Sequence, residues 1–157
     1  MNSVVIYASR SGNTKKVADA LAEVLGESGI VETHSVDDAP KDLRPFDLVV
    51  VGGPTEAHGM TPPMKAYLES IELSTLHAKS CAAFDTRLAW PKVLSGSAAA
   101  GIAGWLRDHD ASLVASPESF IVSTKPELQP GELEHARRWA RTIGQLLPPK
   151  EATSPVA

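Results

Sequence analysis

Cysteine is almost absent from the chain, and long apolar runs and basic tracts are missing altogether. Among 157 residues the one cysteine is Cys81, which excludes an intrachain disulfide framework and any metal or iron–sulfur site built from several cysteines. Its neighbours Ala82, Ala83 and Phe84 are apolar, so a buried core position is expected for Cys81. No apolar run reaches the roughly 20 residues of a membrane-spanning helix, and no basic segment precedes the first apolar run. We therefore expect a cytoplasmic protein with no membrane span.

The excess of one sign of charge is small as well. The chain carries 15 Lys and Arg against 19 Asp and Glu, a formal net charge of −4. Nucleic acid is not an expected partner, because no basic patch or tract is visible. The weak acidity also gives little field for steering a basic protein partner. No metal site is predicted, since the four histidines other than His58 share no metal-ligand spacing. These are His34, His77, His109 and His135.

What the chain does contain is a regular alternation of strand and helix signals. Strands are predicted at residues 3–7, 31–36, 46–51, 80–84 and 113–122, the last interrupted near Pro117. Helices are predicted at residues 14–27, from 61 or 62 to about 71, from an N-cap at Ser97 to about 106, and at 131–147. Such alternation is typical of an α/β fold with a parallel sheet covered on both faces. One domain is expected over residues 1–148, followed by a disordered tail at 149–157.

The segment after the first strand is the most informative part of the chain. Its residues Ser9-Arg10-Ser11-Gly12-Asn13-Thr14 combine hydroxyl groups, an amide and a glycine just before a helix. A phosphate there would meet the unpaired N–H groups and the positive dipole of the helix N-terminus. The glycine patterns of triphosphate and dinucleotide loops are absent, and no cysteine nucleophile is present. The segment is therefore interpreted as a loop that holds a phosphate without transferring it. The alternative is a simple helix cap at Ser11, Asn13 or Thr14.

This segment, continued by Lys15-Lys16-Val17-Ala18, closely resembles the FMN-phosphate loop of flavodoxins. Gly52-Gly53-Pro54-Thr55, which follows the predicted central strand, resembles the loop that this family places against the flavin ring; the alternative is an ordinary turn. The resemblance extends over residues 3–147. It implies a flavodoxin-like three-layer sandwich, with a five-stranded parallel sheet in the order 2-1-3-4-5 and helices on both faces. The ligand crevice of such a sheet lies beyond the carboxyl ends of its strands.

The resemblance also implies a set of residues that bind FMN, drawn from the loops after the first, third and fourth strands. The set comprises Ser9, Arg10, Ser11, Gly12, Asn13, Thr14, Pro54, Thr55, Glu56, His58, Gly59, Asp85, Thr86, Arg87 and Trp90. Thr55 is expected to offer the flavin a hydroxyl and an amide, and Arg87 a positive charge near N1. Trp90 either stacks on the ring or packs as a core residue under its own loop. His58 either contacts substrate or reduced flavin, or is a solvated loop residue.

By this resemblance the chain is expected to carry one or two electrons between a reductase and an acceptor protein. Two alternatives remain open from the sequence. One is an FMN-dependent quinone or porphyrinogen oxidoreductase on the same fold. The other is a flavin-free protein-interaction domain, because the family's usual aromatic residue in the loop after the third strand is missing and only His58 is offered there.

Overall fold

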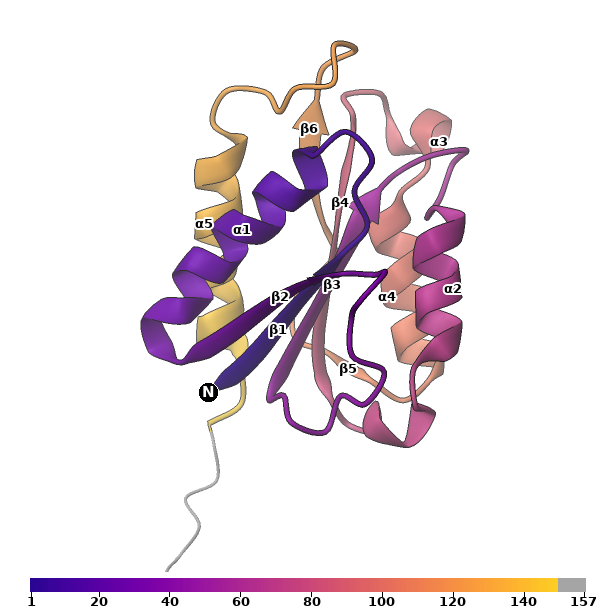
Figure 1. Cartoon of the computed structure of the whole chain (residues 1–157). Helices are drawn as coiled ribbons and strands as arrows, with labels where there is room; N and C mark the ends of the chain where they lie inside the picture. The colour runs from indigo at the N-terminus through magenta and orange to yellow at the C-terminus, as the bar shows by residue number, and fades with distance from the viewer. Residues whose placement is uncertain (150–157) are drawn as a thin grey trace, which may run out of the picture.

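A computed structural model describes residues 1–149, which form one parallel sheet between two layers of helices (Figure 1). The strand order is β2-β1-β3-β4-β5, and β6 also pairs with β4. The strands are β1 (Asn2–Tyr7), β2 (Ile30–Ser35), β3 (Leu48–Pro54), β4 (Ser80–Leu88), β5 (Ser112–Leu113) and β6 (Glu118–Val122). The helices are α1 (Asn13–Leu25), α2 (Pro62–Ser70), α3 (Lys92–Ser95), α4 (Ala98–Asp108) and α5 (Glu132–Leu146), with 3-10 turns η1 (Gly26–Ser28) and η2 (Leu73–Thr75). The predicted fold class and strand order are confirmed.

Continuous apolar runs account for the central strands. In β3 every residue from Leu48 to Gly53 is buried, and in β1 Val4, Val5 and Ile6 have no exposed surface. Strands without an apolar–polar alternation must be covered on both faces, and both faces of this sheet carry helices. Strand β2 has a mixed composition and lies at the edge, as predicted.

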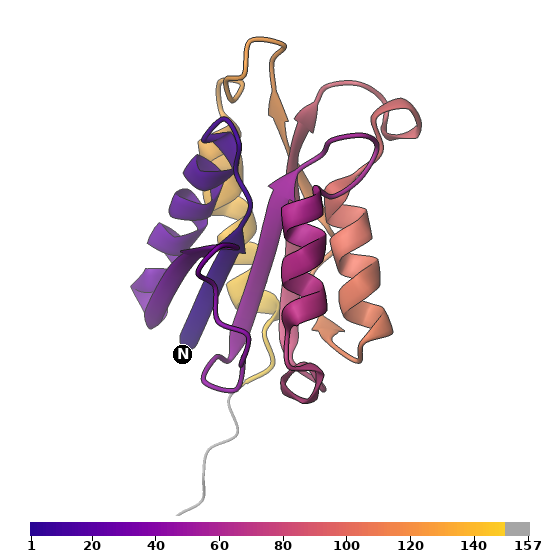
Figure 2. The ribbon, with the colours of Figure 1, turned by 45° about the vertical axis from the view of Figure 1, so that its right-hand side comes forward.

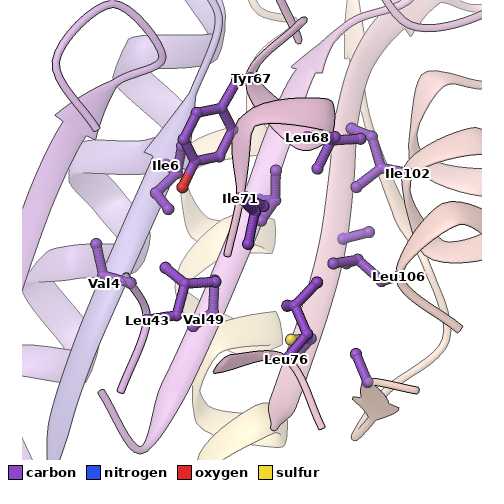
Figure 3. Close-up of a cluster of buried hydrophobic side chains, with 14 of the residues drawn as sticks. Val4, Ile6, Leu43, Val49, Tyr67, Leu68, Ile71, Leu76, Ile102 and Leu106 are labelled. Atoms are coloured by element: carbon purple, nitrogen blue, oxygen red, sulfur yellow. The ribbon is translucent and has the colours of Figure 1, made fainter. Parts of the chain in front are cut away.

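The helices form two layers, with α1 and α5 on one face of the sheet and α2 and α4 on the other (Figure 2). Figure 3 shows the core on the α2 and α4 side, which contains Leu68, Ile102 and Leu106 of the helices and Val4 and Val49 of the sheet. Cys81 belongs to this core and has no exposed surface, which confirms its predicted burial. The other core contains the rings of Phe84, Phe120 and Trp139.

Three strands differ from their predicted extents. Strand β3 spans Leu48–Pro54 and not residues 46–51, so residues 52–54 belong to the strand and not to the loop after it. The fifth predicted strand consists of two short pieces: β5 pairs with the start of β4 and β6 with its end. Pro117 lies between them and has no N–H group for a ladder bond. The prediction that β4 ends at Phe84 is wrong, because the strand continues to Leu88. It is held there by β6, whose Glu118–Val122 pair with its last five residues, and by Gly53 and Pro54 of β3.

The predicted disordered tail lies outside the described residues, apart from Pro149. Among residues 1–149, no helix is both long enough and apolar enough to cross a membrane.

Candidate functional site

Three loops meet at the carboxyl edge of the sheet, seen at the top of Figures 1 and 2. They are the predicted phosphate loop (residues 9–14) after β1, the β3 loop (residues 55–61) and the β4 loop (residues 89–97). The parallel pairing of β1, β3 and β4 brings these loops to one edge. The three loops and the end of β4 contain all the predicted site residues except Pro54, the last residue of β3.

The predicted phosphate loop presents a set of free backbone donors. Gly12 is the N-cap of α1 and has φ +91°, a conformation that side chains disfavour. The N–H groups of Arg10, Ser11 and Asn13, and those of Thr14 and Lys15, meet no acceptor among the described residues, whereas that of Gly12 bonds to Ser9 Oγ at 3.1 Å. The first turn of α1 contains no acidic side chain, and the space beside Gly12 is open.

The side chains of Asn13 and Thr14 point inward from this loop. Asn13 is 3% exposed, and its Nδ2 donates to the carbonyl of Pro126 at 2.7 Å and to Ser11 Oγ at 3.3 Å. The hydroxyl of Thr14 lies 2.8 Å from that of Thr86 on β4. The loop is therefore anchored at two points. The contribution of Pro126, which lies between β6 and α5, has no signal in the sequence.

The β3 loop makes a tight turn at its tip. Glu56 and Gly59 exchange two backbone hydrogen bonds, of 2.9 and 3.0 Å, across Ala57 and His58. Both central residues have positive φ, 46° for Ala57 and 71° for His58, which is costly for residues other than glycine. Gly59 has no positive φ and faces open space, so its backbone does not require glycine.

Contacts tie the β3 loop to its two neighbours. The Arg10 guanidinium of the phosphate loop forms an ion pair with Glu56 at 3.1 Å. The backbone of His58 pairs with that of Gly96 in the β4 loop, where a Cβ on Gly96 would lie 2.0 Å from the His58 carbonyl oxygen. The imidazole of His58 is exposed in this structure.

A buried carboxylate joins β3, β4 and α4. Asp85 has no exposed surface, and its Oδ2 accepts hydrogen bonds from the hydroxyls of Thr55 at 3.1 Å and Ser97 at 2.7 Å. It also accepts from the N–H of Ala99 at 3.0 Å, in the first turn of α4. Ser97 caps α4 as predicted, since its Oγ accepts from the Ala100 N–H. The Oδ1 atom of Asp85 is buried and has no partner among the described residues.

This arrangement changes the expectation for Thr55. Its hydroxyl donates to Asp85 and accepts from the Ala98 N–H at 2.9 Å, while its own N–H donates to the Thr86 carbonyl at 2.9 Å. Both groups that were predicted to face the flavin are occupied within the protein. Thr55 therefore holds the β3 loop to β4 and α4. Asp85, inside β4, holds this strand to the β3 loop and to the start of α4.

The start of the β4 loop is shaped by Arg87. Its guanidinium donates to the carbonyls of Leu88 at 3.1 Å and Trp90 at 2.8 Å. Trp90 is 55% exposed, which is incompatible with packing as a core residue under its own loop. An indole held at the surface beside the predicted site is available for stacking.

Two cavities lie near the ends of the sheet. One of about 120 Å³ opens beside the phosphate loop, lined in part by Arg10, Pro54 and Thr61. The other, of about 610 Å³, lies away from the three loops, at the amino ends of the strands, lined in part by Met1 and Phe46.

The fold is an α/β domain with a loop of free backbone donors at the carboxyl edge of its sheet. A family model described as flavodoxin domain matches residues 4–93, more than half of the chain. The chain belongs to this flavodoxin domain family. None of the curated proteins matches it in sequence.

Solved structures of flavodoxins resemble the whole domain. Oxidised flavodoxin 1 from Bacillus cereus is 22% identical with a TM-score of 0.77, over 92% of this chain and 98% of that chain. A flavodoxin from the domain Archaea is 22% identical with a TM-score of 0.74, over 93% and 99%. A rubredoxin oxygen:oxidoreductase from Desulfovibrio gigas is 23% identical with a TM-score of 0.72, but this chain spans 36% of it. At these identities the likeness establishes the fold.

Proposed function

We propose that the chain binds FMN without a covalent bond and carries one or two electrons between a reductase and an acceptor protein. The observation that carries this proposal is the phosphate loop, whose backbone N–H groups converge at the start of α1 without an acceptor. An anion offsets the desolvation of such donors and interacts favourably with the helix dipole. Because the chain belongs to the flavodoxin domain family, we take this anion to be the phosphate group of FMN.

The protein groups fit a phosphate monoester. No carboxylate stands in the first turn of α1 to repel it, and Gly12 leaves open space beside the loop. The hydroxyls of Ser9 and Ser11 are available as further donors. In the Thr14–Thr86 pair one hydroxyl donates to the other, so when Thr86 donates, the proton of Thr14 remains free to bond the ligand.

Bound FMN would supply reversible one- and two-electron chemistry, and the protein would position the ring and shield it from water. The hydrogen bonds of Thr55 and Ser97 to Asp85 hold the β3 and β4 loops together at the carboxyl edge. Trp90 is the residue with a ring available to stack on the flavin. His58 is the only histidine in these loops, and the carboxylates of Glu56 and Asp85 are engaged by other protein groups, so the site offers few free groups for proton transfer to a substrate. This supports a carrier more than an oxidoreductase of small molecules.

The first experiment is an absorbance spectrum of the purified protein from 300 to 600 nm, followed by titration with FMN and with riboflavin. Riboflavin lacks the phosphate, so we expect it to bind at least about tenfold more weakly than FMN. Thr14→Ala removes a proposed ligand donor and Asn13→Ala removes the anchor of the loop on Pro126, so each should weaken FMN binding by about 1 to 3 kcal/mol. An exposed control, Thr33→Ala on β2, should leave the affinity unchanged.

The outcomes separate the three hypotheses. Flavin bands or saturable FMN binding, without sustained turnover of a quinone, would support the carrier. Rapid multiple turnover with a quinone would favour the oxidoreductase. A protein that stays colourless after FMN addition would favour a flavin-free interaction domain and contradict the proposal.

A further inference from the structure

Apolar side chains are unusually exposed in the β4 loop. Trp90 is 55% exposed, Val93 is 89% exposed and Leu94 is 61% exposed, and we call these three residues the Trp90 patch. Only three other large hydrophobic residues are comparably exposed in the described part of the chain, and they are scattered: Ile30, Leu73 and Leu146. Three such side chains within five residues are a concentrated apolar surface, and clusters of this kind mark interaction sites.

The patch is held in place and not loosely attached. The Arg87 guanidinium bonds to the Trp90 carbonyl, and three backbone hydrogen bonds to Pro91 and Lys92 close the short helix α3. At the end of the β4 loop, the backbone of Gly96 pairs with that of His58 and holds the loop against the β3 loop. Helix α3 stands at the carboxyl edge of the sheet, beyond the start of α4 (Figure 1). A fixed apolar surface costs less conformational entropy to dock than a mobile one.

The charge around the patch is opposite to that of the whole chain. Residues 86–97 contain Arg87 and Lys92 and no Asp or Glu, although the chain has a net charge of −4. The acidic residue of the adjoining β3 loop, Glu56, forms an ion pair with Arg10. Beside the patch, Lys92 is exposed, and its ammonium group has no hydrogen bond or ion pair with any described residue. Arg87 bonds to neutral carbonyl groups, which leave its charge uncompensated.

We propose that the Trp90 patch, with Lys92 and Arg87, docks an acidic electron-transfer protein whose apolar contact face is bordered by carboxylates. The proposal rests on the proposed FMN site, because a partner docked on the Trp90 patch would have its redox centre close to the carboxyl edge of the sheet, where FMN would bind. Apolar burial supplies affinity, and the local cations steer a negatively charged partner and repel a basic one. When bound and fully reduced to its neutral hydroquinone, FMN would supply two electrons, one to each of two one-electron acceptors, and release two protons to solvent.

The test uses two forms of one haem protein as probes. Native cytochrome c is basic, and the same protein with its lysines succinylated is acidic. Binding of each form to the apoprotein and to the FMN-loaded protein is measured by calorimetry, and its reduction by the reduced holoprotein is followed in stopped flow. At low salt we expect the acidic form to bind and react at least about tenfold better, and this advantage to shrink as salt rises.

Matched variants separate the patch from general surface effects. Val93→Ser with Leu94→Ser should weaken binding of the acidic probe at least about fivefold, and Lys92→Glu should reverse the preference between the probes. Leu73→Ser and Arg107→Glu make the same chemical changes at exposed positions elsewhere and should have no effect. None of these five residues belongs to the proposed FMN site, so FMN affinity should stay constant in every variant.

Several results would overturn the docking proposal while leaving the FMN site intact. Equal binding of the two probes by a protein that holds FMN would do so, as would wild-type binding in the Val93→Ser/Leu94→Ser variant. Sedimentation that shows a dimer dispersed by the same double variant would assign the patch to a second copy of the chain. Failure of FMN to bind would instead contradict the proposed function, and probe binding to the apoprotein would still decide the docking.

Discussion

The hydroxyl groups of Thr14 and Thr86 lie 2.8 Å apart in the interior, although 72 positions separate them in the chain. Thr14 stands in the first turn of α1 and Thr86 near the end of β4, and both residues are almost fully buried. Their contact fixes the start of the helix that carries the phosphate loop relative to the strand that carries the β4 loop. The two halves of the proposed flavin site are thus joined by one pair of side chains.

Replacing both members of this pair should cost less than the sum of the two single replacements. Thr14→Val or Thr86→Val leaves the other hydroxyl buried without a partner, and each should lower the free energy of unfolding by about 1 to 3 kcal/mol. In the double variant no hydroxyl is stranded, so the loss should be smaller than the sum of the single losses. Urea denaturation of the four proteins measures this coupling, and strict additivity would contradict it. Thr86→Val should also retain more FMN affinity than Thr14→Val, which removes the proposed ligand donor.

The carboxylate of Asp85 should be needed for the junction of β3, β4 and α4. In Asp85→Asn the hydroxyl and N–H donors that now reach Oδ2 lose a charged acceptor, and the new NH2 group has no acceptor at the position of the unpartnered Oδ1. We expect a loss of about 1 to 3 kcal/mol in the free energy of unfolding. Asp108→Asn, at the exposed end of α4, is the matched control and should change it by less than about 0.5 kcal/mol. Equal effects of the two substitutions would show that the Asp85 contacts contribute nothing.

Glycine is required at one turn and missing at another. Gly96 has φ +71° and no room for a Cβ beside the His58 carbonyl, so Gly96→Ala should destabilise the protein by at least about 2 kcal/mol. Ala57, with φ 46°, should instead gain about 0.5 to 1 kcal/mol on replacement by Gly. Gly59→Ala should be close to neutral, because its surroundings are open and its φ is not positive. Thermal unfolding of the three variants gives the order, and a destabilised Ala57→Gly would contradict the argument.

Much of the fold follows from local sequence patterns. The apolar runs at residues 4–6 and 48–51 predict central strands, Ser97 predicts its helix cap, and glycine at position 12 predicts a loop before α1. The end of β4 could not be predicted in this way. Asp85 and Thr86 are polar and resemble loop residues, and they are buried because distant partners, Ser97 and Thr14, satisfy them.

The parts of the site that the sequence could not predict are all contacts between loops. No local pattern shows that the amide of Asn13 is used by Pro126, or that Thr55 turns its hydroxyl to Asp85. The sequence could not predict whether Trp90 is exposed or buried, because an aromatic residue in a long loop has no periodic apolar neighbours that indicate its burial.

Buried acids in the core between the sheet and α2 should make the protein sensitive to alkali. Burial raises the pKa of the Cys81 thiol from its ordinary value near 9 to about 12. Burial also raises the pKa of the Tyr67 hydroxyl, with a smaller contribution from the nearby Cys81, and this hydroxyl donates to the Pro40 carbonyl at 2.6 Å. In the unfolded chain both groups lose their protons at ordinary pH values, whereas the folded protein retains them to higher pH.

The sign of the effect follows from proton binding. Above about pH 9 the unfolded chain binds fewer protons than the folded one, so the free energy of unfolding falls as pH rises toward 12. Below pH 9 both states hold the thiol proton and the Cys81 contribution is fully present. Cys81→Ala should therefore flatten the decline between pH 9 and 11, and Tyr67→Phe should flatten it above about pH 10. Urea denaturation at stepped pH measures both slopes. A Cys81→Ala slope identical to that of the wild type would contradict a buried, protonated thiol, as would rapid labelling of the native protein by a thiol reagent at pH 8.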